Sequence, residues 1–400
     1  MRLLLALNFL LIPFCYCSIF TESELSVIER DKPSTLKVLL KKSIDGALVE
    51  VKGPHKVYNP LDGRLLSKRH KGRRYWLHPV KNGIKWGNEF NHIHQIRIIP
   101  NNARSSILVG GMQYRGCLDV YLIDDKISLV NEVDVENYLK STLTSKVEEA
   151  QSDEVMDAIV ITARTHAYFT AMHNAKSFWH VDAETEKYEG QGITQLNGRV
   201  DRAVDATKHL VMLLNSQPFA ASWNQNCAGK TASFKAIHRK NVNSTEGVAV
   251  PIAEKERKNF HWCFTMGKKE LASVLNSPQV AKIDLFLDRD SDKVYAVRVN
   301  DGKLSKDYDF EKLQEKIGKK NLASNDFTVK VKNNQILFEG FGKGNGVGLC
   351  LFTAEKLAKG GEIAPKILSQ FFPYTRIEKV RSYDELSEDR VRSVERAQVR

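Results

Sequence analysis

The chain starts with alternating apolar and polar positions and changes to helical spacing near residue 134. Leu36, Val38 and Leu40 alternate with polar or shared positions, as in a half-buried strand. Short apolar runs follow, separated by Gly, Asn and Asp turn signals, at 96–99, 107–109, 117–123 and 127–130. We therefore predict that residues 18–130 form a β-rich N-terminal part.

Helical signals begin where this pattern ends. Asp134 and Ser152 each precede a run of apolar residues at helical spacing, and oxygen-bearing side chains satisfy the first free N–H groups of a helix. A third helix is expected at 200–207. The apolar positions of the first two helices are Val135, Tyr138, Leu139 and Leu143, then Val155, Ile159, Thr162 and Tyr168.

Mixed signals fill the rest of the chain. A hairpin is predicted from strands at 283–287 and 294–299, and a helical stripe from Phe310 ends at Gly318. A strand at 336–338 and a helix capped by Thr353 follow. From Ile377 the chain is half charged, which favours a solvated helix or disorder. The predicted fold class is α+β, with a mixed α/β core over 131–379 and a charged tail over 380–400.

The N-terminal segment is expected to be a targeting signal. Arg2 precedes an apolar run over 3–14, which is too short to span a bilayer but fits a signal peptide over 1–17, cleaved before Ser18. A buried N-terminal segment is the alternative. The signal predicts export to the periplasm or cell envelope, with only transient membrane contact through this peptide.

Charge and composition narrow the functional classes. The 400 residues include 60 Lys plus Arg and 48 Asp plus Glu, a net charge of +12 within a globular composition. A basic loop at 68–74 is interpreted as a solvated hairpin, because no nucleic-acid motif accompanies it. A nucleic-acid partner is disfavoured by the signal peptide as well.

The cysteine and histidine pattern does not indicate a metal site. The four cysteines after residue 17 allow three disulfide connectivities, and buried free thiols are an equal alternative. No CxxC pair is present. His92 and His94 are expected on one strand face, but two ligands do not make a metal site. We expect no metal and no cofactor. The four cysteines are Cys117, Cys227, Cys263 and Cys350.

Three local groups have chemical potential. The loop 340–348 holds five glycines, which suits either an anion-facing loop or a plain tight turn. Cys227 is either a nucleophile that needs a nearby base or a small buried thiol. Glu148 and Glu149 stand before the long helix, as a general acid or base or as solvated helix-start charge. The histidines available to Cys227 are His209, His238 and His261.

Six segments, in order, resemble motifs of the SpoIID/LytB family, the stage II sporulation protein D group of bacterial cell-wall proteins. The match covers most of residues 35–378. The segments are Tyr114-Arg-Gly116; Val130-Asn131 with Val135-Glu-Asn-Tyr-Leu139; Asp157 to Thr165; Asn226-Cys-Ala-Gly-Lys-Thr231; Gly344-Asn-Gly-Val-Gly348; and Gln370-Phe-Phe-Pro-Tyr-Thr375.

The resemblance implies action on peptidoglycan glycan strands, which members of that family cut or bind. In cutting members, the lytic transglycosylases, one glutamate protonates the glycosidic oxygen. An ungapped count from Arg164 places Lys146 at that position, and Asn345 replaces the family's histidine in its glycine-rich motif. A lysine acid would need its pKa lowered by about four units from ~10.4, roughly 5 kcal/mol. Some members have Cys and His residues of a metal-binding type, and these are absent here, where residues 185–190 stand.

Two functions follow, both in cell-wall remodelling or septation, on denuded or peptide-bearing strands. One is a divergent lytic transglycosylase with Glu148 or Glu149 as a relocated acid. The other is a non-catalytic glycan-binding module that has lost the acid. Other cell-wall hydrolases are candidate partners. The resemblance assigns substrate binding to Arg164, Trp223, Asn226, Cys227, Gly229, Lys230, Thr231 and Asn345.

Overall fold

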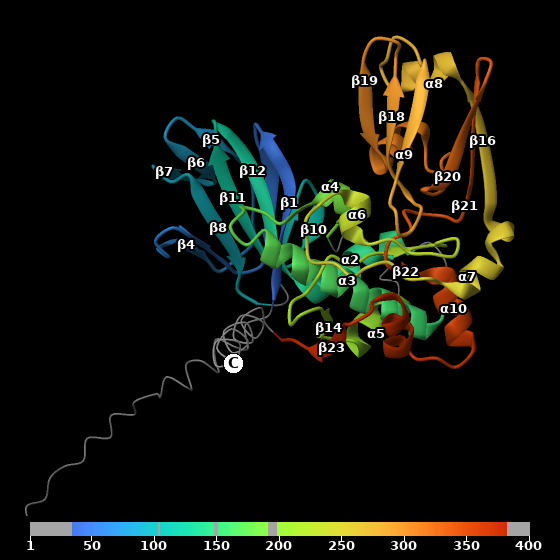
Figure 1. Ribbon diagram of the computed structural model, residues 1–400. Helices are drawn as coiled ribbons and strands as arrows, with labels where there is room; N and C mark the ends of the chain where they lie inside the picture. Colours follow the sequence, from blue (N-terminus) through green and yellow to red (C-terminus); the bar gives the residue numbers. More distant parts are fainter. Residues whose placement is uncertain (1–33, 103–104, 148–150, 191–197, 382–400) are drawn as a thin grey trace, which may run out of the picture.

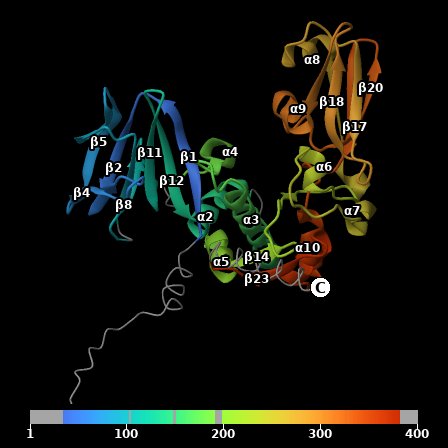
Figure 2. The ribbon, with the colours of Figure 1, turned by 60° about the vertical axis from the view of Figure 1, so that its left-hand side comes forward.

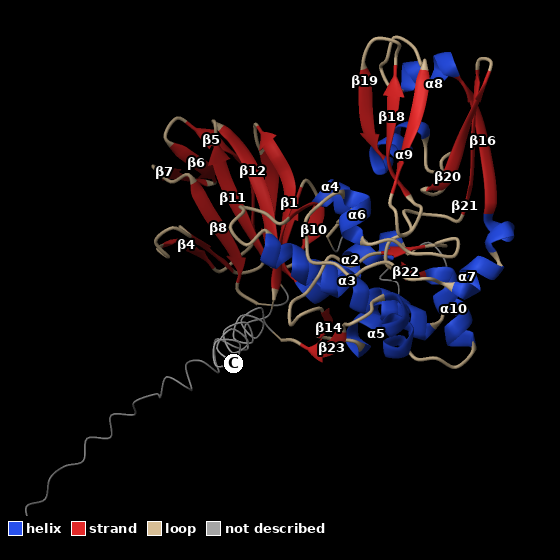
Figure 3. Cartoon of the chain, viewed as in Figure 1, coloured by secondary structure: helices blue, strands red, loops and turns tan. Residues whose placement is uncertain are grey.

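The structure is a computed structural model that describes residues 34–102, 105–147, 151–190 and 198–381. Strands dominate its N-terminal part, helices gather in the middle, and a second strand-rich unit stands beyond them (Figures 1 and 3). The α+β prediction is confirmed. Among the described residues, no helix combines the length and apolar character needed to cross a bilayer.

The N-terminal part contains two sheets that share one apolar core. Residues from both sheets, including Val38, Leu77 and Ile107, are fully buried in the same cluster. The first sheet runs, in spatial order, β13 (Val181–Asp182), β1 (Thr35–Ile44), β12 (Lys126–Asp134), β11 (Cys117–Ile123), β8 (Gln95–Pro100), β3 (His55–Tyr58) and β4 (Leu65–Arg69). The second runs β10 (Met112–Tyr114), β9 (Ser106–Val109), β2 (Ala47–Lys52), β5 (Arg73–Val80), β6 (Gly83–Trp86) and β7 (Asn88–Asn91).

A helical layer continues from β12 without a break in the core. The Asp134 carboxylate accepts hydrogen bonds from the N–H groups of Glu136 and Asn137, so it caps the first helix as predicted. Apolar residues of this layer belong to the same cluster as the sheets. Its helices are α2 (Val135–Lys146), α3 (Asp153–His173), α4 (Ala183–Glu186), α5 (Gly198–Ala206), α10 (Leu351–Lys359) and α11 (Ala364–Phe371).

Small elements complete the layer. Two strand pairs close it: β14 (Leu210–Leu213) with β23 (Arg376–Lys379), antiparallel, and β15 (Trp223–Asn224) with β22 (Leu349–Cys350), parallel. The short helices α6 (Phe234–His238), α7 (Pro251–Lys255) and η1 (Arg257–Phe260) lead toward the second strand-rich unit.

That second unit has its own hydrophobic core, formed around Phe310, Phe327 and Phe338. Figure 2 shows it on the opposite side of the helical layer from the N-terminal sheets. Its sheets are β16 (His261–Gly267), β21 (Gln335–Phe341) and β20 (Asp326–Lys332), and β17 (Lys282–Leu287), β18 (Val294–Asn300) and β19 (Ser305–Asp309). Its helices are α8 (Lys268–Val274) and α9 (Phe310–Ile317).

A buried lysine fastens this unit to the rest of the molecule. The Lys293 ammonium, 1% exposed, donates to the Cys227 carbonyl and to the Asp326 carboxylate, both at 2.7 Å. Arg257 bonds Asp326 as well. Because a buried ammonium without partners is costly, these bonds favour one arrangement of the unit against the 226–231 segment.

Several local predictions hold and others are wrong. The hairpin of β17 and β18 and the end of α9 at Gly318, with φ +99°, are confirmed. The helix after the glycine loop begins at Leu351, and its N-cap is Cys350 and not the predicted Thr353, three residues later. Residues from Ile377 to Lys379 pair with β14 and form a strand, because Ile377 packs on the main core.

Two further predictions in the N-terminal part are wrong. His92 and His94 do not share a strand face, because they lie in the turn between β7 and β8, where His92 has φ +59°. The basic segment 68–74 is not a hairpin, since β4 pairs with β3 in one sheet and β5 with β2 and β6 in the other. It crosses between the two sheets.

Candidate functional site

A cavity of about 410 Å³ opens where the helical layer meets the second strand-rich unit. Its walls come from α2, α3, α4, α6 and α9, together with the strand β15 and the glycine loop. These segments are far apart in sequence. The polar and aromatic side chains that line it are Tyr138, Lys146, His166, Glu186, Trp223, Phe234, His238, Glu311, Lys319 and Asn345.

An ion pair occupies one wall of the cavity. The Lys146 ammonium at the end of α2 lies 2.5 Å from a carboxylate oxygen of Glu186 at the end of α4, and each side chain is about a quarter exposed. The Tyr138 hydroxyl donates to the same oxygen at 3.3 Å. Glu186 is thus paired with the residue that the ungapped count places at the family's glutamate.

His166 contributes a neutral imidazole. Burial lowers the pKa of His166 to about 4, so its ring is uncharged at neutral pH. Its Nδ1 atom has no hydrogen-bond partner among the described residues. A buried ring nitrogen without a partner costs free energy, so it is suited to bond a hydroxyl or amide of a ligand.

A histidine–glutamate pair lies on another wall. His238 Nδ1 is 3.4 Å from a carboxylate oxygen of Glu311, which α9 contributes from the second strand-rich unit. Hydrogen bonds from His238 and Asn345 lower the pKa of Glu311. Nε2 of His238 is buried and has no partner among the described residues. The lowered pKa of Glu311 means that its carboxylate is held as an anion.

Trp223 brings an aromatic surface into the cavity. It pairs with Leu349 in the short parallel ladder of β15 and β22. That ladder requires close approach of the glycine loop, since a Cβ at Gly348 would meet the Ser222 carbonyl oxygen at 2.1 Å. Gly348 has φ +72°, a conformation that favours glycine. The glycine loop therefore positions Trp223 and Asn345 on the same cavity.

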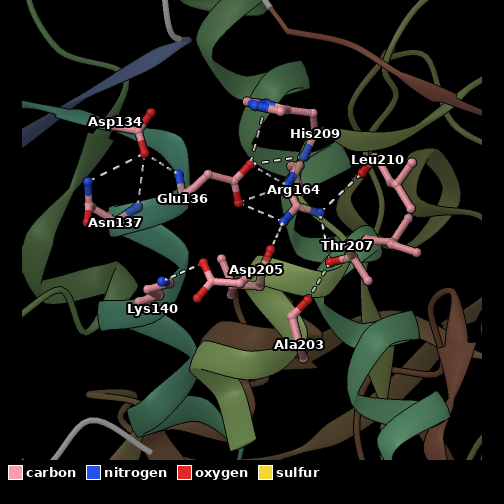
Figure 4. A network of polar contacts seen from close by, with 12 residues as sticks. Asp134, Glu136, Asn137, Lys140, Arg164, Ala203, Asp205, Thr207, His209 and Leu210 are labelled. Atoms are coloured by element: carbon pink, nitrogen blue, oxygen red, sulfur yellow. Dashed lines mark hydrogen bonds and ion pairs between the residues drawn. The ribbon is translucent and has the colours of Figure 1, made fainter. Parts of the chain in front are cut away.

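Arg164, assigned to substrate binding by the resemblance, does not line this cavity. Its side chain is fully buried, and its guanidinium donates to both Glu136 carboxylate oxygens. It also bonds the Thr207 hydroxyl and the Leu210 carbonyl (Figure 4). The arginine of one family motif and the glutamate of another thus tie α3 to α2 inside the core.

The 226–231 segment lies behind the cavity wall. Cys227 is buried, and its N–H lies 3.4 Å from the Cys350 sulfur. Thr231 is buried and its hydroxyl accepts from the Val248 N–H at 2.8 Å, while Lys230 is exposed and pairs with Asp292. Asn226 caps a local turn through the Ala228 N–H. None of these side chains lines the cavity.

The Glu254 side chain packs closely against Gly229. A Cβ at this position, where φ is +110°, would meet a Glu254 carboxylate oxygen at 1.7 Å. Gly229 therefore allows close packing with α7. We propose that the 226–231 segment supports the cavity wall from behind. Of the residues that the resemblance assigns to binding, Trp223 and Asn345 line the cavity.

The cysteines of the described residues are all free thiols, and Cys227 and Cys350 contact each other. Hydrogen bonds from Cys227 lower the pKa of Cys350 to about 6, while the same pairing and burial raise the pKa of Cys227. Neither lines the cavity. No group of three or more potential metal-ligating side chains occurs among the residues that the structure describes.

The proposed relocated acids, Glu148 and Glu149, lie outside the residues that the structure describes. Within the described part, Glu186 and Glu311 are the glutamates that line the cavity. Sequence reasoning missed both. Glu186 falls in 185–190, the segment that replaces the Cys/His residues of some family members, and this departure was the available signal. Glu311 comes from a separate core and has no local signal.

Comparison with known protein families matches a region that includes part of the helical layer. Residues 123–214, from the end of β11 through β14, match the family described as SpoIID, stage II sporulation protein. The chain carries a SpoIID region. The resemblance to the SpoIID family is therefore confirmed over these residues. The description of the family relates this region to sporulation.

Three relatives are similar to the chain, all of them uncharacterized proteins. One from Chlamydia pneumoniae is 37% identical over 179 residues, which is 44% of this chain and 65% of that protein. One from Chlamydia muridarum is 36% identical over 179 residues, 44% of this chain and 62% of that protein. The alignments thus span less than two thirds of both chlamydial proteins.

A more distant relative covers more of the chain. An uncharacterized protein of Brachyspira hyodysenteriae is 24% identical over 346 residues, 83% of this chain and 91% of that protein. The similarity therefore extends well beyond the SpoIID region.

Proposed function

We propose that this SpoIID-region protein binds glycan strands of peptidoglycan in the cavity between the helical layer and the second strand-rich unit. One observation carries the proposal: Lys146, placed by an ungapped count at the family's glutamate, Trp223, just before the 226–231 segment, and Asn345 of the glycine loop line the same cavity. Its volume of about 410 Å³ lies in the range of small-ligand sites, roughly 300–1,000 Å³.

The side chains in the cavity suit a sugar. Saccharides combine hydroxyls that donate and accept hydrogen bonds with apolar ring faces that pack on aromatic side chains. Trp223 offers such a face. Polar contacts come from the Lys146 ammonium and from one ring nitrogen each of His166 and His238, which have no partner in the described part of the chain. The side-chain oxygens of Glu186 and Glu311 can accept hydrogen bonds from hydroxyls.

Charge favours binding over acid catalysis. A general acid that protonates a glycosidic oxygen needs a raised pKa. Hydrogen bonds lower the pKa of Glu311, and the Glu186 carboxylate forms an ion pair with the Lys146 ammonium. We therefore rank glycan binding first.

Lytic transglycosylation is the second candidate function. It is favoured by the position of Glu186, whose carboxylate lies 2.5 Å from the ammonium that stands at the family's glutamate position. In this case Glu186 would supply the proton to the glycosidic oxygen.

Sedimentation with purified peptidoglycan sacculi tests the proposal. We expect Trp223→Ala to weaken binding about tenfold, corresponding to about 1.4 kcal/mol of lost packing on a sugar ring. The matched control is Trp76→Ala, which removes an indole that is 55% exposed on the N-terminal sheet. Equal binding by both variants and the wild type, or no retention of the wild type, would contradict the proposal.

A further inference from the structure

A second hollow, of about 140 Å³, lies in the N-terminal part, outside the SpoIID match. It forms at the edge where β3 and β4 of one sheet face β5, β6 and β7 of the other. The basic segment 68–74 crosses between the sheets there. We call it the His55 hollow, and it is lined by His55, Arg69, Arg73, Tyr75, Trp86 and Gly87 among others.

A buried histidine forms part of the wall of this hollow. His55 is 0% exposed, and its Nδ1 lies 3.1 Å from the Gly53 carbonyl oxygen. A carbonyl only accepts, so Nδ1 carries the proton and Nε2 presents a lone pair. Nε2 has no partner among the residues that the structure describes. Burial, with Arg69 and Arg73, lowers the pKa of His55 and keeps it neutral.

Two arginines line the hollow with their charges uncompensated. Arg69 donates to the Asn88 side-chain oxygen at 3.0 Å, and Arg73 donates to the Tyr75 hydroxyl at 3.2 Å. Both acceptors are neutral. Within the described residues, no carboxylate forms an ion pair with either guanidinium, whereas neighbouring Arg74 lies 3.8 Å from Glu50. Guanidinium groups are typical binding groups for carboxylates and phosphates, and two of them lie in this hollow.

Aromatic rings complete the hollow, and a glycine allows their arrangement. Tyr75 and Trp86 meet edge to face, with centroids 6.5 Å apart. Gly87 has φ +68°, and a Cβ there would meet the Tyr75 ring at 2.8 Å. The rings therefore lie close to the two arginines because position 87 has no side chain. Such rings suit the apolar face of a sugar.

We propose that the His55 hollow binds the anionic substituent of an acidic saccharide, a carboxylate or a phosphate. Arg69 and Arg73 bond the oxyanion, and the Nε2 lone pair of His55 accepts a hydrogen bond from a sugar hydroxyl or a protonated phosphate oxygen. The ring of Tyr75, which is 39% exposed, packs against the attached sugar, and the buried Trp86 supports it from behind. This site is separate from the cavity and does not depend on its function.

Calorimetric titration of the full-length protein tests this assignment with glucose 6-phosphate, glucuronate and neutral glucose as probes. We expect at least one of the two anions to bind at least tenfold more tightly than glucose. The phosphate source is indicated if glucose 6-phosphate binds more tightly, and the carboxylate source if glucuronate does. Equal binding of all three probes, or no binding, would overturn the assignment.

Matched variants separate a site from general charge. The double variant Arg69→Gln, Arg73→Gln should lose at least tenfold in anion affinity. The control, Lys71→Gln with Arg74→Gln, removes the same charge from side chains that do not line the hollow and should bind like the wild type. Equal losses in both would overturn the proposal.

A second readout applies if the arginine variant does not fold. The imidazole NMR signal of His55 in the wild type should shift on addition of the tighter-binding anion and stay unchanged with glucose. An unchanged His55 signal with both anions would overturn the assignment.

Discussion

Lys146 and Glu186 form the contact that most affects the chemistry of the cavity. Each carries a charge that the other stabilises, and the Tyr138 hydroxyl donates a further hydrogen bond to the carboxylate. Such a pair can exchange hydrogen bonds with the hydroxyls of a ligand. An ungapped count along the sequence places Lys146 at the family's glutamate position. It does not predict the partner, because Glu186 follows 40 residues later in a four-residue helix.

Replacing Lys146 with glutamate should place a protonated carboxyl group in the cavity. In Lys146→Glu, two carboxylates would share the space of one ion pair, and like-charge repulsion raises the pKa of one of them. That produces the protonated acid that glycosidic cleavage needs. We expect release of anhydro-muropeptides from sacculi to rise at least about tenfold, since a general acid contributes ~10²–10⁴-fold.

Lys146→Gln is the control for this change, because it removes the positive charge without adding a carboxyl group. Its release of anhydro-muropeptides should stay at the wild-type level. If the glutamate and glutamine variants release equal amounts, Lys146 does not stand where an acid acts on the strand.

Helix α3 shows how sequence motifs act at the scale of elements. Its start near Asp153 follows from the acidic first turn, although the Ser152 side chain makes no capping bond. Arg164 comes from a motif that the resemblance connects with substrate, yet it ties α3 to α2 through Glu136. The spacing of apolar residues along one helix predicts its buried face. It does not predict which element holds the partner of Arg164, because that depends on how the helices pack.

The stability of these helices should depend on that buried pair. Arg164→Met leaves the Glu136 carboxylate buried without its cation, which should lower the free energy of unfolding by about 3–5 kcal/mol. Urea denaturation followed by circular dichroism measures this. Lys140→Met is the control, since it removes the outer Lys140–Asp205 pair and should cost less than about 1 kcal/mol. Equal costs would contradict a core role for Arg164.

At the scale of the whole molecule, the cavity exists because the second strand-rich unit faces the helical layer. Lys293 fastens the unit through its bond to the Cys227 carbonyl, and Glu311 reaches the cavity from the unit. The α+β class and most element positions follow from periodicity. The approach of Glu311 to His238, 73 residues away along the chain, does not, because it results from the packing of two separate cores.

We propose that a glycan strand occupies this cavity. The most direct measurement is a crystal structure of the protein with a soluble tetrasaccharide of two N-acetylglucosaminyl–N-acetylmuramic acid units. We predict sugar density between Trp223 and Asn345, with a hydroxyl or amide within hydrogen-bond distance of His166 Nδ1. An empty cavity at saturating tetrasaccharide, with sugar bound elsewhere or not at all, would contradict the account.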